Sequence, residues 1–231
     1  MLPAIISLTT IPDRVPHLRP TLESLLAQEL PVYLWAVREI PRSRTVLEAV
    51  PEWITALGVH AALVPDCGPL TKLLPALKLG PRFVLTADDD HVYGAGWADG
   101  LLTWAEQLPD CAVGYRGRQL TGKGYRGTRL IQKSRIAAPT QVDILTGAWG
   151  ACYPSKAFGR EIYTDWRAWP SNDDLVIAAH LQRRNVARYV VPAQVSIHAT
   201  GAQHTAPLST VNRGHQDRRN DAGLQALGLE G

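Results

Sequence analysis

Three adjacent carboxylates are the first feature of this sequence that could do chemistry. Asp88, Asp89 and Asp90 follow the apolar run "FVLT" within "FVLTADDDHVYGAG". Asp is a poor strand former, and three neighbouring anions repel one another, so a divalent cation with oxygen ligands would offset the repulsion. Asp also favours helix N-caps and turns, which leaves a cap or a solvated turn as the alternative to a metal site.

A second acid pair opens the apolar pattern of "NDDLVIAAHLQRRN". This segment is predicted to be a helix, because acids lie at its start and bases at its end, as the helix dipole favours. Helix capping accounts for one acid, and we expect the earlier one, Asp173, to serve as the cap. The other acid is then free to accept a proton from a hydroxyl group.

Two further residues could contribute to the same chemistry. Lys72 lies near the start of the predicted helix "TKLLPALKLG", where it could meet a phosphate. The alternative is a surface lysine on an amphipathic helix. His198 ends a late strand in "VSIHATG" and could supply a metal ligand from a separate strand, or it could be a structural histidine.

The elements that must position these residues alternate between strands and helices. We expect strands at 4–11, 32–37, 59–65 and 83–86 and helices at 17–30, 45–58 (around a break at Pro51) and 71–80. This alternation predicts an α/β domain with a mostly parallel central sheet flanked by helices. Ligands bind outside the carboxyl ends of the strands in such sheets, and the three carboxylates follow one of those ends.

The second half of the chain alternates less regularly. Helices are expected at 97–108 and 172–185, a strand at 111–117, two strands joined by a Gly-rich turn at 143–154, and late strands within 187–200. Residues 114–141 carry seven Lys or Arg (116, 118, 123, 126, 129, 133 and 135), no Asp or Glu, and several Gly. We interpret this stretch as a mobile loop, either a lid that covers a diphosphate or gathers an anionic acceptor, or plain solvated surface. The same two interpretations apply to Arg213, His215, Arg218 and Arg219.

Composition narrows the class of protein. A chain of 231 residues suits one domain, and its net charge of +3 is too small to indicate a nucleic-acid partner. Cys67, Cys111 and Cys152 match no metal-ligand spacing and are expected to be reduced thiols. No signal peptide or transmembrane segment is visible. We therefore expect a soluble cytoplasmic protein, with contact to the inner membrane surface left open.

Five segments, in order, resemble nucleotide-sugar-dependent glycosyltransferases of the GT-A fold: "SLTTIPDR", "GPLTKLLPAL", "VLTADDDHVY", "GAWGACYP" and "NDDLVIAAHLQRRN". The resemblance covers about Ile5 to His198, and the acidic run is similar to the DXD motif, with Asp88 and Asp90 as its outer acids. It implies a Rossmann-like single domain: a nucleotide-binding half at about 1–110, a smaller acceptor-side half at about 111–205, and a polar tail at about 206–231.

Site roles follow from the resemblance. The donor nucleotide sugar, favoured as UDP-linked with GDP left open, would lie against Thr9, Thr10, Arg14, Lys72, Asp88 and Asp89. Mn²⁺ or Mg²⁺ would be held by Asp90 and His198. The "GAW" turn of Gly147, Ala148 and Trp149 would line the acceptor side, with Trp149 equally interpretable as core packing. The family's pair is often Glu-Asp, so either Asp173 or Asp174 could be the base, and its second acid points to Asp174.

The implied reaction is sugar transfer to a glycan, lipid-linked or other hydroxyl acceptor. No carboxylate nucleophile is evident on the opposite face, which favours inversion over retention. A nucleotidyltransferase is an alternative, but "SLTTIPDR" lacks the Gly-rich loop those enzymes usually carry after their first strand. A phosphohydrolase usually has its acid pair at the end of the first strand. A non-catalytic sugar- or nucleotide-binding module would have no use for the acids at 173–174.

Overall fold

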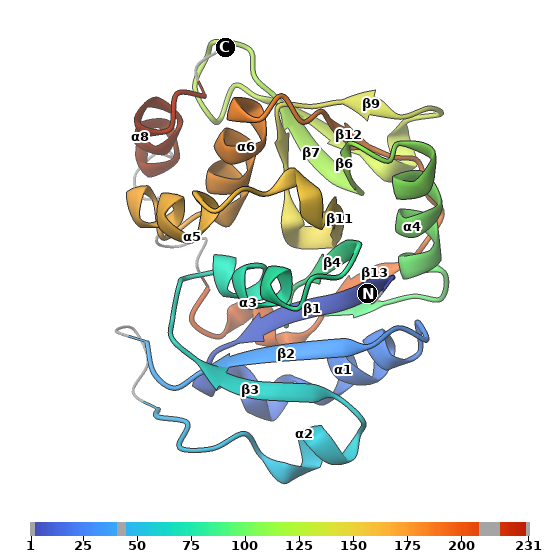
Figure 1. The fold of residues 1–231 in the computed structure, drawn as a ribbon, viewed down its shortest axis with the longest axis vertical. Coiled ribbons are helices and arrows are strands. Elements are labelled where there is room, and N and C mark those ends of the chain that lie inside the picture. Colours follow the sequence, from blue (N-terminus) through green and yellow to red (C-terminus); the bar gives the residue numbers. More distant parts are fainter. Residues whose placement is uncertain (1–2, 41–44, 208–217, 230–231) are drawn as a thin grey trace.

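The computed structural model describes residues 3–40, 45–207 and 218–229 (Figure 1). Arg213 and His215 therefore lie outside the described residues. None of the helices in these three ranges is both long enough and apolar enough to cross a membrane. Cys67, Cys111 and Cys152 are all free thiols, and Cys152 is buried.

One eight-stranded sheet runs through the molecule in the order β3-β2-β1-β4-β11-β6-β12-β9. β1, β2, β3 and β4 are mutually parallel, as are β6 and β12, while β11 and β9 run antiparallel to their neighbours. The strands of this sheet are β1 (Ala4–Thr10), β2 (Val32–Val37), β3 (His60–Val64), β4 (Phe83–Ala87), β6 (Ala112–Gly114), β9 (Thr140–Gln141), β11 (Ala151–Pro154) and β12 (Arg188–Val190).

Both faces of the sheet are buried, which explains the continuous apolar runs in its central strands. Successive residues of β1 alternate between two cores, because Ile6 packs in one hydrophobic cluster and Ile5 in the other. The helices that cover the sheet are α1 (Arg19–Leu26), α2 (Glu52–Ala56) and α4 (Trp97–Gln107) on the Ile6 side, and α3 (Leu74–Lys78), α5 (Ile162–Asp165) and α6 (Asp173–Arg183) on the Ile5 side. The prediction of a mostly parallel sheet flanked by helices is confirmed.

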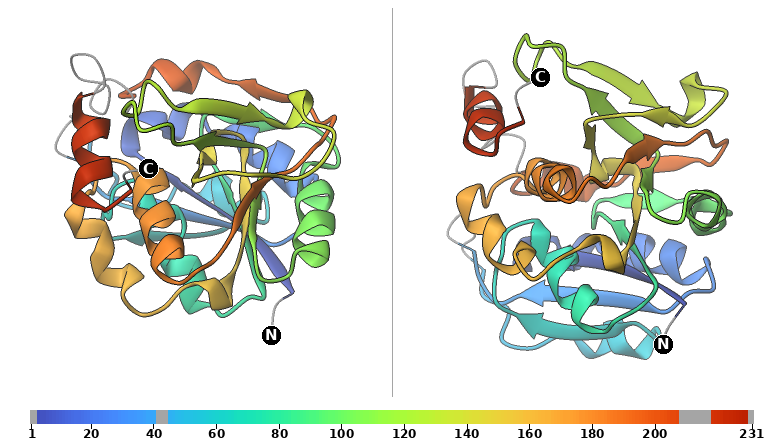
Figure 2. Two further views of the ribbon diagram at one scale, coloured as in Figure 1. Left: turned by 90° about the horizontal axis from the view of Figure 1, so that it is seen from above. Right: turned by 45° about the horizontal axis from the view of Figure 1, so that its top comes forward.

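A third, smaller core joins α6 to the C-terminal helix α8 (Arg218–Ala226). Leu175 and Ala178 of α6 pack with Leu224 of α8 and with Ile144. The views of Figures 1 and 2 place α8 beside α6 and away from the β1–β3 edge. The end of the chain is therefore packed against the helix that carries the second acid pair.

The basic stretch at 114–141 is not the loop that its composition predicts. It contains β7 (Arg116–Gln119) and β8 (Arg129–Gln132), which form a three-stranded antiparallel sheet with β10 (Ile144–Leu145) (Figure 2). Buried Ile131 anchors the hairpin to the core. β7 and β8 each bury one residue, Gly117 and Ile131, so the sequence shows little of the apolar alternation that indicates strands.

One predicted helix is shorter in the structure than expected, and one small sheet was not predicted. The segment predicted to be helical around a Pro break at 45–58 forms a helix only after Pro51, which is the N-cap of α2. A two-stranded sheet of β5 (His91–Tyr93) and β13 (Ile197–Ala199) lies next to the acidic run. β5 comes directly after Asp90, so this small sheet fixes where the chain goes after the three carboxylates.

Candidate active site

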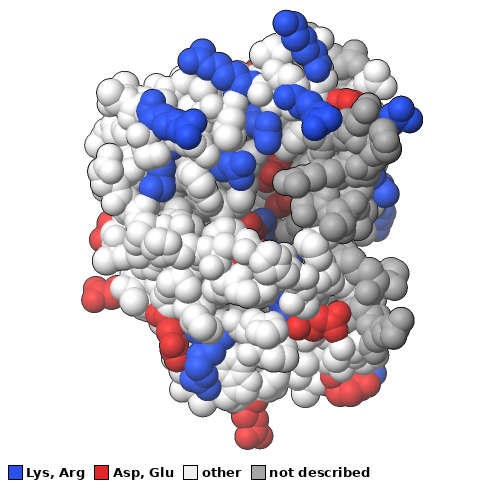
Figure 3. All heavy atoms as spheres, turned by 180° about the vertical axis from the view of Figure 1, so that it is seen from behind, with Lys and Arg blue, Asp and Glu red and all other residues white. Residues whose placement is uncertain are grey.

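The carboxyl ends of β1 and β4 open into a cleft of about 1060 Å³. Figure 3 shows carboxylate atoms in a recess near the middle of one face, with Lys and Arg atoms gathered mainly above it. The predicted site residues that line this cleft are Thr9, Thr10, Arg14, Lys72, Asp88, Asp89, Asp90, Gly147, Ala148, Asp173 and Asp174. The fold thus brings residues from five separate segments to one place.

The backbone at Asp88 is held by a buried tyrosine. β4 ends at Ala87, and the Asp88 N–H donates to the Tyr93 hydroxyl at 2.8 Å, which in turn donates to the Asp88 carbonyl at 3.3 Å. Tyr93 is 2% exposed and packs against Trp97. The direction in which the acidic run leaves the strand is therefore fixed by the core.

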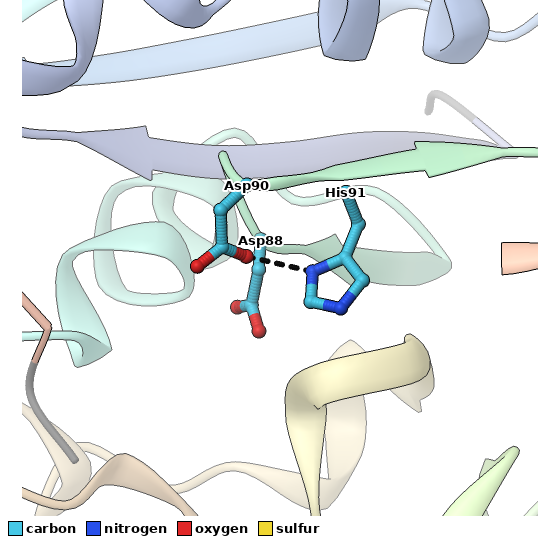
Figure 4. Close-up of side chains that lie close together, drawn as sticks. All are labelled: Asp88, Asp90 and His91. Carbon is cyan, nitrogen blue, oxygen red and sulfur yellow. Dashed lines mark hydrogen bonds and ion pairs between the residues drawn. The ribbon is translucent and has the colours of Figure 1, made fainter. Parts of the chain in front are cut away.

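Asp88, Asp90 and His91 form a group that could hold a metal ion. One ligand atom of each lies within 4.8 Å of the others, and all three side chains point into the same space (Figure 4). His91 Nδ1 lies 2.6 Å from Asp90 Oδ1. Burial lowers the pKa of His91, but the hydrogen bond to Asp90 and the neighbouring carboxylates outweigh it, so the pKa is raised.

His198 does not join this group. It lies on β13, opposite Val92 of β5, and its side chain is exposed. His91, which the residue pattern did not single out, occupies the place next to Asp90. Its signal in the sequence is the fourth letter of "DDDH", a ligand-type residue adjoining the acids.

Asp89 ties the acidic run to the end of β1. It is 5% exposed, accepts a hydrogen bond from Thr10 Oγ1 at 2.6 Å, and pairs with Arg14 Nη1 at 2.5 Å. The same Arg14 nitrogen lies 3.3 Å from Asp90 Oδ2. Thr9 donates instead to the Trp35 carbonyl. Thr10 and Arg14 therefore hold the carboxylates as well as lining the cleft.

Lys72 connects the two acid groups. Its side chain is 7% exposed, and its Nζ lies 2.7 Å from Asp88 Oδ1 and 2.9 Å from Asp173 Oδ2. Burial lowers the pKa of Lys72, but Asp173 and Asp88 outweigh this and hold it well above its ordinary value. The same contact lowers the pKa of Asp88 against the effect of burial. Lys72 is therefore charged, and it fixes the spacing of the two groups.

The cap of α6 is Asn172 and not Asp173, which corrects the sequence prediction. The Asn172 side chain accepts from the Leu175 N–H at 3.3 Å, so neither acid is needed as a cap. Asp173 faces Lys72, while Asp174 Oδ1 accepts the Gly147 N–H at 2.9 Å. Burial, followed by the charge of Asp173, raises the pKa of Asp174 to about 7. Asp174 can therefore exchange a proton near neutral pH.

The turn Gly147–Trp149 contributes differently along its length. Gly147 and Ala148 line the cleft, whereas Trp149 packs against the hydrophobic core and its carbonyl accepts from Trp97 Nε1. The core-packing interpretation of Trp149 fits this position. Further residues line the cleft: Arg116, Arg118, Tyr125 and Arg126 of the basic stretch, Trp166, and Arg219 and Asn220 of α8.

No protein-family model matches the sequence, and no curated protein matches it. Solved structures do match the fold. S. aureus TarS 1–349 in complex with UDP aligns over all of the chain with a TM-score of 0.57 and 15% identity. The same protein with UDP-GlcNAc aligns over 91% with a TM-score of 0.55 and 14% identity. GalNAc-T7 with UDP, GalNAc and Mn²⁺ aligns over 97% with a TM-score of 0.62 and 8% identity.

The chain spans 65%, 61% and 48% of the length of those three structures, respectively. At such low identity the likeness shows the fold alone. It confirms the α/β, Rossmann-like architecture of the GT-A type that the sequence predicts.

Proposed function

We propose that the chain is a glycosyltransferase that moves a sugar from a nucleotide-diphosphate sugar to an acceptor hydroxyl. The observation that carries the proposal is the pairing of two acid groups in one cleft, with Lys72 between them. One group has the chemistry of a cation site and the other that of a proton acceptor. The fold likeness supports the proposal, because solved structures with this fold hold UDP, UDP-GlcNAc, GalNAc and Mn²⁺.

The residues at the end of β4 fit Mn²⁺ or Mg²⁺. Two carboxylates and an imidazole offer one ligand atom each within 4.8 Å of one another. Carboxylate oxygens are hard ligands and imidazole nitrogen is an intermediate one, and Mn²⁺ accepts both. His91 Nδ1 already faces Asp90 Oδ1, so an ion held by both residues would take the place of their hydrogen bond. We assign Asp90, Asp88 and His91 to this site. A divalent ion there would neutralise the diphosphate leaving group.

The donor side of the cleft is assigned to the β1 and β4 ends. Thr9, Thr10 and Arg14 line it beside Asp88 and Asp89, where the base and ribose would bind. A UDP-sugar is favoured over a GDP-sugar. Lys72 acts by holding Asp88 and Asp173 in position, since both of its close contacts are carboxylates.

Proton transfer is assigned to Asp174. Its pKa of about 7 suits a general base at neutral pH, and the Gly147 N–H orients the carboxylate. Asp173 is held by Lys72 and is the less available of the two acids. A single base beside the acceptor suits direct displacement, with the hydroxyl oxygen bonding to the anomeric carbon as the bond to the diphosphate breaks. The anomeric centre is then inverted.

Thermal shift with UDP and GDP, with and without Mn²⁺, tests the proposal directly. We expect one nucleotide to raise the melting temperature only when Mn²⁺ is present, and chelation to abolish the effect. Asp90→Asn should lose this response while the free protein melts within a few degrees of the wild type, because Asp90 is not a core residue. Asp110→Asn is the matched control, since Asp110 is exposed and does not line the cleft.

The outcomes separate the competing functions. Failure of both nucleotides to bind would refute the proposal. Binding without hydrolysis or transfer of the donor would leave a non-catalytic module. Release of pyrophosphate from a nucleoside triphosphate and a sugar 1-phosphate would instead identify a nucleotidyltransferase. A product with the anomeric configuration of the donor would exclude the inverting mechanism.

A further inference from the structure

The β7–β8 connection, residues 120–128, is attached to the C-terminal helix by a carboxylate. Asp221 of α8 accepts the Tyr125 N–H on its Oδ1 at 2.6 Å. The connection contains three glycines, and most of its residues are exposed. A segment of this kind holds its position poorly through its own packing. The hydrogen bond from α8 therefore helps to fix where Tyr125 lies.

A glycine makes this attachment possible. Gly124 has a φ of +68°, and a Cβ atom there would lie 2.7 Å from Asp221 Oδ1. A side chain at this position would be strained by the backbone and would push the carboxylate away from the Tyr125 N–H. The contact thus depends on residue choice in two segments, since its two partners lie 96 residues apart in the sequence.

The residue before Asp221 contacts the other side of the cleft. Asn220 is 4% exposed, and its Oδ1 accepts a hydrogen bond from Asn172 Nδ2 at 3.0 Å. Asn172 is the cap of α6, which carries the proposed base Asp174 in its first turn. Two consecutive side chains of α8 therefore bond to the start of α6 and to the β7–β8 connection. In this way α8 sets the position of Tyr125 relative to Asp174.

Tyr125 lies on the side of the cleft where the acceptor hydroxyl has to bind. It lines the cleft and packs against the third core, which contains Leu175, the residue next to Asp174. Burial, followed by the charge of Asp174, raises the pKa of the Tyr125 phenol, so this charge acts on the tyrosine side chain. An acceptor whose hydroxyl meets Asp174 would therefore lie beside Tyr125.

The lining of this side suits a sugar ring. Tyr125 and Trp166 are aromatic residues of the cleft. Arg118 lies over the Tyr125 ring at 4.7 Å, and this contact favours one orientation of the ring. A tyrosine side chain has an apolar body and a polar tip, and a sugar likewise has apolar C–H faces and hydroxyl edges. A few polar groups beside aromatic side chains are typical of sites for such ligands.

We propose that Tyr125 contacts a sugar ring of the acceptor and that Asp221 is the positioning residue that holds it there. This inference rests on the proposed function, to which it adds the acceptor class, a saccharide or glycoside. The donor and the ion bind at the β1 and β4 ends, so their binding does not require the attachment to α8.

Transfer to p-nitrophenyl glycosides tests the inference. The β-glucoside, the β-galactoside and the β-N-acetylglucosaminide are each offered with Mn²⁺ and with UDP-glucose, UDP-N-acetylglucosamine, UDP-N-acetylgalactosamine or GDP-mannose. The acceptor KM and kcat are measured, together with hydrolysis of the donor when no acceptor is present. The thermal shift with UDP or GDP and Mn²⁺ is recorded in parallel.

The variants separate positioning from folding. Asp221→Ala removes the acceptor of the Tyr125 N–H, whereas Asp221→Asn keeps an oxygen in its place. Gly124→Ala disturbs the same contact from its other side. Tyr125→Leu removes the ring itself, and Tyr125→Leu/Asp221→Ala shows whether the two residues act together. The control is Gln225→Ala, an exposed position of α8 outside the cleft.

We expect the wild type to transfer sugar to at least one glycoside. Asp221→Ala, Gly124→Ala and Tyr125→Leu should each raise the acceptor KM by about tenfold, while donor hydrolysis and the nucleotide response stay unchanged. Asp221→Asn and Gln225→Ala should keep the KM within about twofold of the wild type. Asp221→Ala should add little in the Tyr125→Leu background, because it acts through Tyr125.

Three results would overturn the inference alone. One is a protein that binds and hydrolyses a donor but transfers sugar to none of the glycosides. Another is a fall in donor hydrolysis that matches the rise of the acceptor KM in Asp221→Ala, which would leave Asp221 a purely structural role. The third is full additivity of Asp221→Ala and Tyr125→Leu. Absence of any nucleotide response in the wild type would instead refute the proposed function, and the acceptor role with it.

Discussion

Replacing Asp174 with Asn should stabilise the protein above neutral pH while it greatly lowers turnover. The structure keeps Asp174 protonated to higher pH than an unfolded chain would, because burial and the charge of Asp173 raise its pKa to about 7 from 3.8. Ionised Asp174 therefore opposes folding, and the isosteric amide removes that cost. Asn Oδ1 can still accept the Gly147 N–H that Asp174 Oδ1 accepts now.

The size of the effect follows from the two pKa values. A difference of about three pH units corresponds to roughly 4 kcal/mol, at about 1.4 kcal/mol per unit. Asp174 lines an open cleft and is partly exposed, so screening by water reduces this figure. We expect Asp174→Asn to raise the free energy of unfolding by about 2 kcal/mol at pH 8.

The direction in which wild-type stability changes with pH follows from the raised pKa of Asp174. Below about pH 4 the carboxyl is protonated in both states, and it does not affect stability differently from the amide. Between about pH 4 and pH 7 the unfolded chain releases the proton and the folded chain keeps it, so the wild type loses stability as pH rises. Above pH 7 the loss is complete. The stability difference between variant and wild type should therefore grow across this interval and then level off.

Urea denaturation at half-unit steps from pH 4.5 to 8.5 measures the difference, with Asp110→Asn as the control for loss of one exposed acid. A constant difference across the range would refute the perturbed titration of Asp174. Turnover is measured on the same samples, and it should fall by about 10²-fold or more without loss of nucleotide affinity. Near-normal turnover in Asp174→Asn would sink its assignment as the base, whatever the stability data show.

Three further experiments test other parts of the site. Lys72→Met should destabilise the fold by about 3 kcal/mol at pH 7, because two carboxylates lose their shared cation; an unchanged urea midpoint would contradict this. Asn172→Ala should cost about 1 kcal/mol by removing the α6 cap, and an unchanged melting temperature would contradict that role. Trypsin should cut the β7–β8 connection at 120–128 more slowly when nucleotide and Mn²⁺ are bound, and equal cleavage rates would exclude a lid.

Much of the framework could be predicted because it depends on local patterns. Apolar runs with no polar alternation, such as the one at β1, indicate strands buried on both faces, and helices between them indicate a parallel sheet. The rule that ligands bind at the carboxyl ends of such strands then predicts that Asp88 and Asp90 lie at the site. Periodicity and one topological rule were sufficient for this.

Pairings between distant side chains could not be predicted in the same way. The sequence suggested that Lys72 would meet a phosphate, but its close partners are Asp88 and Asp173. Nothing local identifies which of several acids a buried lysine will contact, because that depends on how η2 (Leu70–Lys72) packs beneath β1. The cap of α6 was assigned to Asp173 for a related reason, since Asn172 and both acids are all good caps, and only tertiary contacts choose among them.

The role of Gly147 in the site cannot be predicted from its residue type. A Cβ atom at this position would lie 3.2 Å from Lys72 Nζ, so a side chain would crowd the cation, and it would be in ordinary contact with Asp174 Oδ1 at 3.5 Å. The absence of a side chain lets the Gly147 N–H reach Asp174 while Lys72 reaches Asp173 beside it. In the sequence this glycine is one of 19. Its importance comes from the two segments that converge on it, 75 and 27 residues away.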